Sequence, residues 1–140
     1  MYRLELHPDA EADLDYLWET DPDGAADVSV LIQELAGDEE KLRAMRIHQR
    51  EEGRLHFSRL LKYHIWGRNL WRAKIAELED EECVLAYRLI YGFTMETSVN
   101  YLLAVMHRNT GYEKNLLFVE RIRRACRELG IPGLPGRESH

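Results

Sequence analysis

Three segments in the second half of the chain are rich in the aliphatic and aromatic residues that favour β-strands. They span residues 70–78, 83–93 and 99–107. The connections between them are short: an acidic turn at 79–82 and a second turn at 94–98. Short connections favour antiparallel neighbours, so this pattern predicts an antiparallel β-meander.

The N-terminal segment has the alternating pattern of a further strand. Tyr2, Leu4 and Leu6 alternate with two charged residues, and Pro8 ends the segment. We expect this strand, over residues 2–6, to join the sheet of the meander.

Two helices are predicted after this strand. Pro8 and Asp9 open the first, and the turn at 21–24 ends it. The second helix ends at Gly37, and a further helical turn follows over 38–45. The apolar stripes comprise Leu14, Leu17 and Trp18 in the first helix, and Val28, Leu31, Ile32 and Leu35 in the second.

Weaker patterns lead from these helices to the meander. The polar segment 47–53 predicts a loop, and residues 55–58 predict a short strand. Residues 59–66 predict a short helix that ends at Gly67.

A C-terminal helix is predicted over residues 115–129, where apolar residues recur at helical spacing before Gly130. We expect residues 131–140 to form a disordered tail and residues 1–130 to form a single domain. The fold class is then α+β. It is a small two-layer domain with an N-terminal strand and two helices, followed by an antiparallel β-meander and a C-terminal helix.

Length and composition agree with one folded domain. The 140 residues are 45% hydrophobic and 31% charged, and no apolar run reaches the roughly 20 residues that cross a bilayer. The N-terminus lacks the apolar core of a signal peptide, so we expect a cytoplasmic protein without a membrane partner. Cys83 and Cys126 are expected to be reduced, inert thiols, and no zinc pattern is present.

Charge is distributed unevenly along the chain, whose net charge is −6. Residues 1–53 hold 15 acidic and 5 basic residues, whereas residues 54–127 hold 13 basic and 8 acidic residues. This asymmetry suggests an anionic partner bound locally by the second part. The alternative is that solvated helix faces merely differ in composition.

Cations interrupt all three strands of the meander, although a core strand has no structural need for a charge. Arg72 and Lys74 are two residues apart and are therefore expected on one face of the sheet. Arg88 belongs to the next strand, and His107 and Arg108 lie at the end of the last one. In a meander these residues can converge on one open face, where guanidinium groups would bind phosphate oxygens.

Three strand segments occur in a fixed order in the second half of the chain. They are residues 69–75, 87–91 and 103–108, and Tyr112 and Glu113 follow the last one. In these segments and in the order of strands and helices, the chain resembles the RelE/ParE superfamily of bacterial toxin–antitoxin toxins. The resemblance implies a toxin that binds the ribosomal A site, cleaves mRNA, and is held in check by a cognate antitoxin. Contact with DNA would be indirect, through the antitoxin.

The resemblance also implies site residues. Arg72 and Lys74 match the basic pair of the family's second strand, and Arg88 matches the arginine of its third. Arg108 matches the arginine that closes the fourth strand, and Tyr112 approximates a tyrosine near the start of the last helix. The chain departs from the family in its net negative charge and in the greater length of residues 41–69.

The chemistry fits RNA as substrate. The neighbouring 2′-OH of RNA is the nucleophile, so the protein needs no nucleophile of its own, no metal and no cofactor. Arg88 and Arg108 would stabilise charge on the transition state. His107 is the strand-end group whose ordinary pKa suits proton transfer, with Lys74 or Tyr112 as substitutes.

Two other functions remain open on the sequence. The acidic first third would repel ribosomal RNA, which favours a non-enzymatic binding module of the same fold, either a ParE-like gyrase inhibitor or an inactive toxin. The third possibility is a small interaction domain in which the strand cations pair internally.

Each candidate residue also has a purely structural interpretation. Arg72 and Lys74 could pair with Glu77 or Glu79, and Arg88 could bridge to Asp13 or Asp15. His107 could be hydrogen-bonded to the backbone, and Tyr112 could pack on the last helix.

The C-terminal helix carries four further cations. They would form its polar face or contact rRNA, and they are Arg121, Arg123, Arg124 and Arg127.

Overall fold

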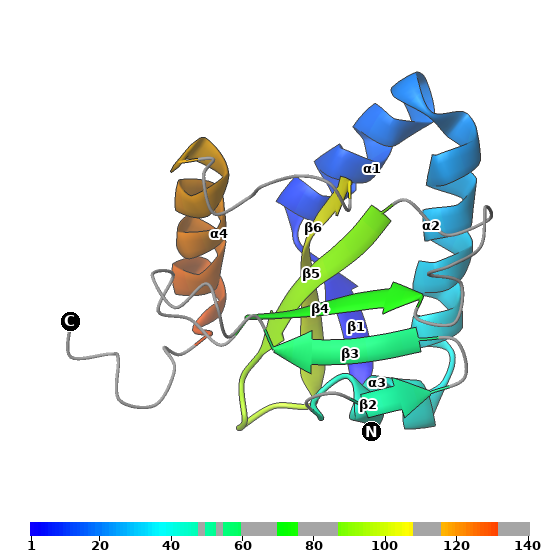
Figure 1. Ribbon diagram of the computed structural model, residues 1–140. Coiled ribbons are helices and arrows are strands. Elements are labelled where there is room, and N and C mark those ends of the chain that lie inside the picture. The colour runs from blue at the N-terminus through cyan, green and yellow to red at the C-terminus, as the bar shows by residue number, and fades with distance from the viewer. Residues whose placement is uncertain (48–49, 53–54, 60–69, 76–86, 108–115, 132–140) are drawn as a thin grey trace.

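The computed structural model describes residues 1–47, 50–52, 55–59, 70–75, 87–107 and 116–131, with the strands between residues 50 and 75 described as backbone (Figure 1). The predicted helix at 59–66 falls almost entirely outside the described residues, as does the tail beyond residue 131. The elements are β1 (Arg3–Leu6), α1 (Pro8–Thr20), α2 (Pro22–Ala36), α3 (Glu39–Ala44), β2 (Arg50–Glu52), β3 (Leu55–Arg59), β4 (Leu70–Ile75), β5 (Tyr87–Phe93), β6 (Val99–His107) and α4 (Leu116–Leu129).

The strands form one mixed sheet in the order β1-β6-β5-β4-β3-β2. Strands β2 to β6 make an antiparallel meander, as the pattern predicted, and β1 lies parallel to β6 at the edge. Strong twist turns β3 and β4 nearly across the direction of β5 and β6 (Figure 1). The fold class is therefore α+β.

One difference from the sequence expectation falls in the connecting region. The meander begins earlier than predicted, because β2 occupies part of the expected loop at 47–53. Its residues are Arg-Glu-Glu, and they pair with β3 through their backbones rather than through an apolar pattern. The strand expected at 55–58 is confirmed as β3.

Side chains cap the start of each of the first three helices. The His7 side chain caps α1 by accepting from the Asp9 N–H, and Asp21 alone separates α1 from α2 while capping α2 through Gly24 N–H. The predicted turn at 38–45 is α3, capped by Asp38.

The prediction that Trp18 belongs to the apolar stripe of α1 is wrong. Trp18 is 47% exposed, whereas Leu17 is buried. Leu17 already occupies the core-facing position of this turn of the helix, and the neighbouring Trp18 lies about 100° around the helix from it.

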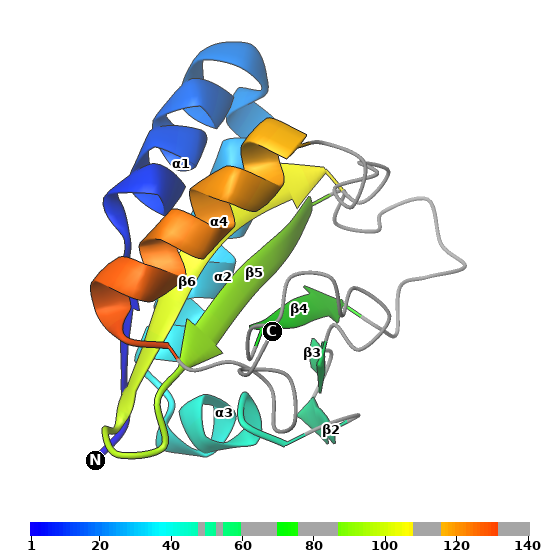
Figure 2. The ribbon, with the colours of Figure 1, turned by 90° about the vertical axis from the view of Figure 1, so that its left-hand side faces the viewer.

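The sheet separates two clusters of buried apolar side chains. Leu89, Tyr91 and Phe93 of β5 pack toward α1, α2 and α3. Ile90 packs on the opposite face with Leu103 and with the apolar side of α4. Figure 2 shows α4 lying along β6 and α2 behind the sheet. Helices α1, α2 and α3 thus cover one face of the sheet, and α4 covers the other.

A β-bulge interrupts the pairing of β5 with β6. Ile90 pairs with Ala104 and Tyr91 with Leu102, so Leu103 has no partner on β5. Leu103 is fully buried against α4 instead. In the described part of the chain, no helix has both the length and the apolar character needed to cross a membrane.

Candidate functional site

Arg88 and His107 lie on opposite faces of the sheet. In the β5–β6 register Arg88 pairs with Met106, whose side chain belongs to the α4 cluster. Tyr87 pairs with His107, and Tyr87 packs against the α1–α3 cluster. The expectation that both cations converge on one face is therefore wrong, because consecutive strand residues alternate in direction.

Arg88 is partly buried on the α4 face. Among the described residues, no hydrogen-bond or ion-pair partner of Arg88 is found. The alternative interpretation, a bridge from Arg88 to Asp13, is not found, since Asp13 binds Arg121 instead. A partly buried guanidinium without a carboxylate partner retains its full capacity to bind an anion.

The backbone register brings β4 beside Arg88. Arg72 pairs with Ile90, which is two positions from Arg88 along β5, and Lys74 pairs with His56 on β3. Arg72 and Arg88 are therefore at neighbouring positions of adjacent strands. Arg108 and Tyr112 lie outside the described residues.

On the opposite face, His107 belongs to a cluster with Tyr87 and Asp21. The Tyr87 hydroxyl donates to Asp21 Oδ2 at 2.7 Å, and the Tyr87 and His107 rings meet edge to face with centroids 5.5 Å apart.

The cluster shifts two pKa values in opposite directions. Burial, followed by the hydrogen bond to Asp21, raises the pKa of Tyr87 to about 12. The Tyr87 hydrogen bond lowers the pKa of Asp21, helped by the Gly24 N–H and, to a smaller extent, by the charge of His107. At neutral pH the pair is thus a neutral phenol donating to a carboxylate.

Gly24 allows this close approach of α2 to β5. A Cβ at position 24 would lie 2.5 Å from Asp21 Oδ2 and 2.7 Å from Tyr87 Cε2. No side chain fits there without displacing one partner of the hydrogen bond.

A pocket of about 530 Å³ opens beside the cluster, between α1, α4 and the end of β6. Its walls are mixed in character, with apolar and aromatic groups beside polar ones. They comprise Asp13, Tyr16, Leu17, Thr20, Tyr87, Val105, Met106, His107, Phe118 and Arg121.

Asp13 and Arg121 close the edge of β6 beyond the end of β1. Arg121 donates to both Asp13 carboxylate oxygens at 3.0 and 2.7 Å, and also to Leu103 C=O at 3.1 Å. Asp13 Oδ2 accepts from the Val105 N–H at 3.0 Å. This ion pair satisfies backbone groups that a neighbouring strand would otherwise satisfy, so Arg121 has a structural role.

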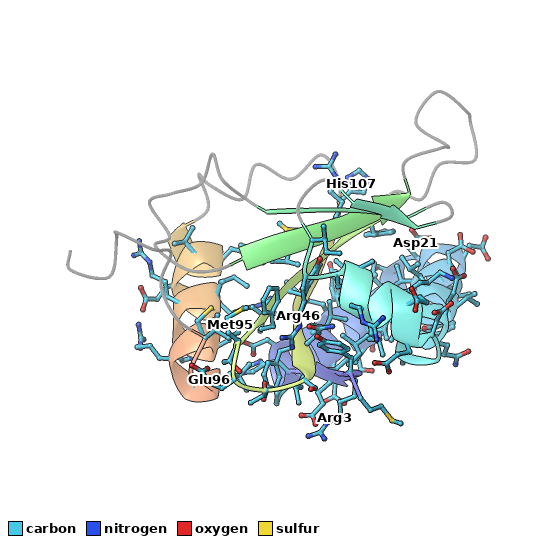
Figure 3. All side chains as sticks on the ribbon, turned by 90° about the horizontal axis from the view of Figure 1, so that it is seen from below. Arg3, Asp21, Arg46, Met95, Glu96 and His107 are labelled. Carbon is cyan, nitrogen blue, oxygen red and sulfur yellow. The ribbon has the colours of Figure 1, made fainter. Side chains whose placement is uncertain are left out.

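Arg46 is a partly buried cation that the sequence pattern did not mark as a candidate. It donates to Asn100 Oδ1 and to the carbonyls of Thr94 and Val99. Its guanidinium also lies 4.4 Å from the Phe93 ring centroid. These contacts fix α3 to the β5–β6 turn beside Met95 and Glu96 (Figure 3). Arg46 lies between the predicted helical turn at 38–45 and the polar segment at 47–53, where no periodic pattern of apolar residues indicates a contact with the core.

Within the ranges that the structure describes, no group of His, Cys, Asp and Glu side chains is arranged to hold a metal ion. Compared with protein-family models, curated proteins and solved structures, the chain matches none.

Proposed function

We propose that the chain is the toxin component of a toxin–antitoxin module, a RelE-like, ribosome-dependent mRNA endonuclease of the cytoplasm. The observation that carries the proposal is Arg88. It is a partly buried arginine on a sheet face, without a carboxylate partner among the described residues. It lies two positions along β5 from Ile90, which pairs with Arg72. Such a face is suited to the phosphates of RNA.

In the proposed reaction a ribose 2′-OH loses its proton and attacks the adjacent phosphorus. The bond from phosphorus to the 5′-oxygen of the next nucleotide breaks, that oxygen leaves as a protonated 5′-OH, and a 2′,3′-cyclic phosphate remains. Arg88 and Arg108 stabilise the negative charge of the transition state, and Arg72 helps to position the RNA. The chemistry requires no metal. The partners are mRNA on the ribosome and a cognate antitoxin, through which any contact with DNA is made.

The position of His107 changes the assignment of proton transfer. Since His107 belongs to the face opposite Arg88, it is not placed to serve a phosphate bound at Arg88. The remaining groups able to transfer protons are Lys74 and Tyr112, and we assign this role to them.

The decisive experiment replaces both arginines. Arg88→Ala combined with Arg108→Ala is expected to abolish growth arrest and to reduce mRNA cleavage by on the order of 100-fold or more. The matched control is Arg43→Ala, which removes an exposed cation whose carboxylate partner, Glu40, is 3.4 Å away. Full toxicity of a folded double variant would disprove the proposal.

A second experiment tests the proton-transfer assignment. His107→Ala is expected to change the cleavage rate less than about threefold, whereas Lys74→Ala or Tyr112→Phe should lower it by about 100-fold. Primer extension on ribosome-bound mRNA gives the rates. A large loss in the His107 variant alone would return His107 to the catalytic site.

A non-enzymatic module of this fold is the second candidate, and the placement of His107 away from Arg88 favours it. Such a module would bind an anionic partner through Arg88 without cleaving it. In vitro translation and DNA gyrase supercoiling assays distinguish the two functions. A-site cuts support the endonuclease, whereas supercoiling inhibition without cuts supports the gyrase-binding module.

A further inference from the structure

We propose that β1 pairs with β1 of a second copy of this chain, in an antiparallel register centred on Leu4. The result would be a twofold dimer in which the two sheets continue through their β1 edges. The proposal rests on backbone groups and charges at this edge and is independent of the function proposed above.

The outer edge of β1 is available for pairing. Within the part of the chain that the structure describes, β6 is its one strand neighbour. Arg3 N–H and His7 N–H point to β6, where they donate to the carbonyls of Ser98 and Leu102. Because backbone groups alternate along a strand, those of Leu4 and Leu6 point outward.

This alternation limits the possible registers. In an antiparallel pair, outward-pointing residues must face each other to exchange hydrogen bonds. Centring the pair on Leu4 places Arg3 of one copy opposite Glu5 of the other, twice by symmetry. Shifting the centre to Glu5 would oppose two glutamates, and shifting it to Arg3 would oppose two arginines, which is unfavourable.

The other face of β1 is also self-complementary in this register. Leu4 would face Leu4 of the second copy, and Tyr2 would face its Leu6. All three side chains are only partly buried although they pack against the core of α1 to α3. A second copy would cover the apolar surface that the edge position leaves exposed.

The charged face of the strand is open to solvent. The side chains of Arg3 and Glu5 are 66% and 45% exposed, and they form an ion pair within the strand at 2.7 Å. In the dimer each carboxylate would lie between two guanidinium groups. Isolated like charges on an edge strand would prevent pairing, whereas this alternation of opposite charges favours one register.

An existing hydrogen bond limits the length of the backbone ladder between the two β1 strands. Tyr2 N–H donates to the Glu39 carboxylate, at 3.0 Å to Oε2, so it does not take part. Its carbonyl can still accept from the Leu6 N–H of the second copy. The short ladder implies a small interface, and we expect a weak dimer that requires a high protein concentration.

The test is charge reversal followed by mass measurement. Sedimentation equilibrium of the untagged chain, from about 10 μM to about 1 mM, should show a monomer–dimer equilibrium. Arg3→Glu alone and Glu5→Arg alone are each expected to weaken it by about tenfold, since each opposes like charges. Arg3→Glu combined with Glu5→Arg restores complementarity and should restore dimerisation.

A cross-link gives an independent readout of the register. Arg3→Cys combined with Glu5→Cys should yield a covalent dimer under mild oxidation, because these positions face each other across the twofold axis. Arg3→Cys alone is the matched control and should not. Circular dichroism confirms that each variant is folded.

Three results would overturn the proposal. They are a wild-type chain that stays monomeric up to 1 mM, a dimer that both single reversals leave unchanged, or one that the double reversal does not rescue. A dimer insensitive to these changes would use a different surface.

Discussion

Individual side chains in this protein owe their roles to partners that are distant in sequence. Tyr87 is the clearest case, because its hydroxyl binds Asp21, 66 residues away, and its ring meets His107. The hydrogen bond joins β5 to the start of α2. Its strength should therefore appear both in the titration of Tyr87 and in the stability of the fold.

Tyr87→Phe is expected to lower stability over a defined pH range. The pKa of Tyr87 is raised to about 12, above its value of about 10 in an unfolded chain. The bond thus contributes fully below pH 10, and its contribution is lost as pH rises from 10 to 12. Asp21 has a lowered pKa, so its contribution is present above about pH 4 and is lost as pH falls through the lowered pKa.

The measurement is denaturant unfolding of wild type and the Phe variant as a function of pH, with ultraviolet titration of the phenolates. The stability difference should be constant near neutrality and should vanish toward pH 12. A difference that grows above pH 10 would contradict the assignment.

Gly24→Ala is expected to destabilise the fold by about 1–3 kcal/mol, since the added methyl overlaps Asp21 Oδ2 and Tyr87 Cε2. Gly37→Ala is the matched control. A Cβ at position 37 meets Gln33 O at 3.3 Å, a contact that a small shift relieves. Thermal unfolding of both variants gives the comparison, and equal melting temperatures would argue against the overlap.

Helix α4 is attached to the rest of the molecule by polar contacts at both ends as well as by its apolar side. Arg121 binds Asp13 and the backbone of β6 near the first end. Near the last turn, Glu128 lies 2.8 Å from His7 Nε2, whose ring also caps α1. Helices α1 and α4 are therefore joined directly, through His7 at the start of α1 and Glu128 near the end of α4.

Arg121→Ala is expected to cost about 1–3 kcal/mol, because Asp13 Oδ1 and Leu103 C=O lose the donor that Arg121 supplies, while Asp13 Oδ2 keeps only the Val105 N–H. Arg127→Ala, which removes an exposed partner of Glu120, should change stability by less than about 0.5 kcal/mol. Urea unfolding followed by circular dichroism measures both. Similar values for the two variants would mean that α4 is held by its apolar side alone.

Acidic and basic groups are unevenly distributed among the described elements. The helices α1 and α2 contain no lysine or arginine, whereas Arg88 belongs to the opposite face of the sheet. Charges more than a Debye length apart, about 8 Å at physiological salt, are largely screened. A locally cationic site is therefore compatible with a net charge of −6.

Neutralising the exposed acids of α1 tests this separation. Glu11→Gln, Asp15→Asn and Glu19→Gln together should change RNA affinity less than about twofold at 0.15 M salt, and more at low salt. Filter binding across a salt series measures the effect. A large gain at physiological salt would show that the helical layer repels RNA from the sheet.

The helices, the strands and the α+β class follow from local patterns in the chain. Apolar residues at helical spacing, the caps at Asp21 and Asp38, and the short turn at 94–98 all act within a few residues. An antiparallel meander then follows from short connections. These features were predictable because the free energy that selects them is determined by neighbours along the chain.

Other features depend on which elements meet in space. Sequence alone left open whether Arg88 would bind Asp13, and it wrongly grouped His107 with Arg88. The bulge at Leu103 and the contact between Tyr87 and Asp21 likewise arise from packing between elements. A strand's alternation shows which residues share a face, but packing between elements decides which helices cover each face and, among the described residues, which cations meet a carboxylate.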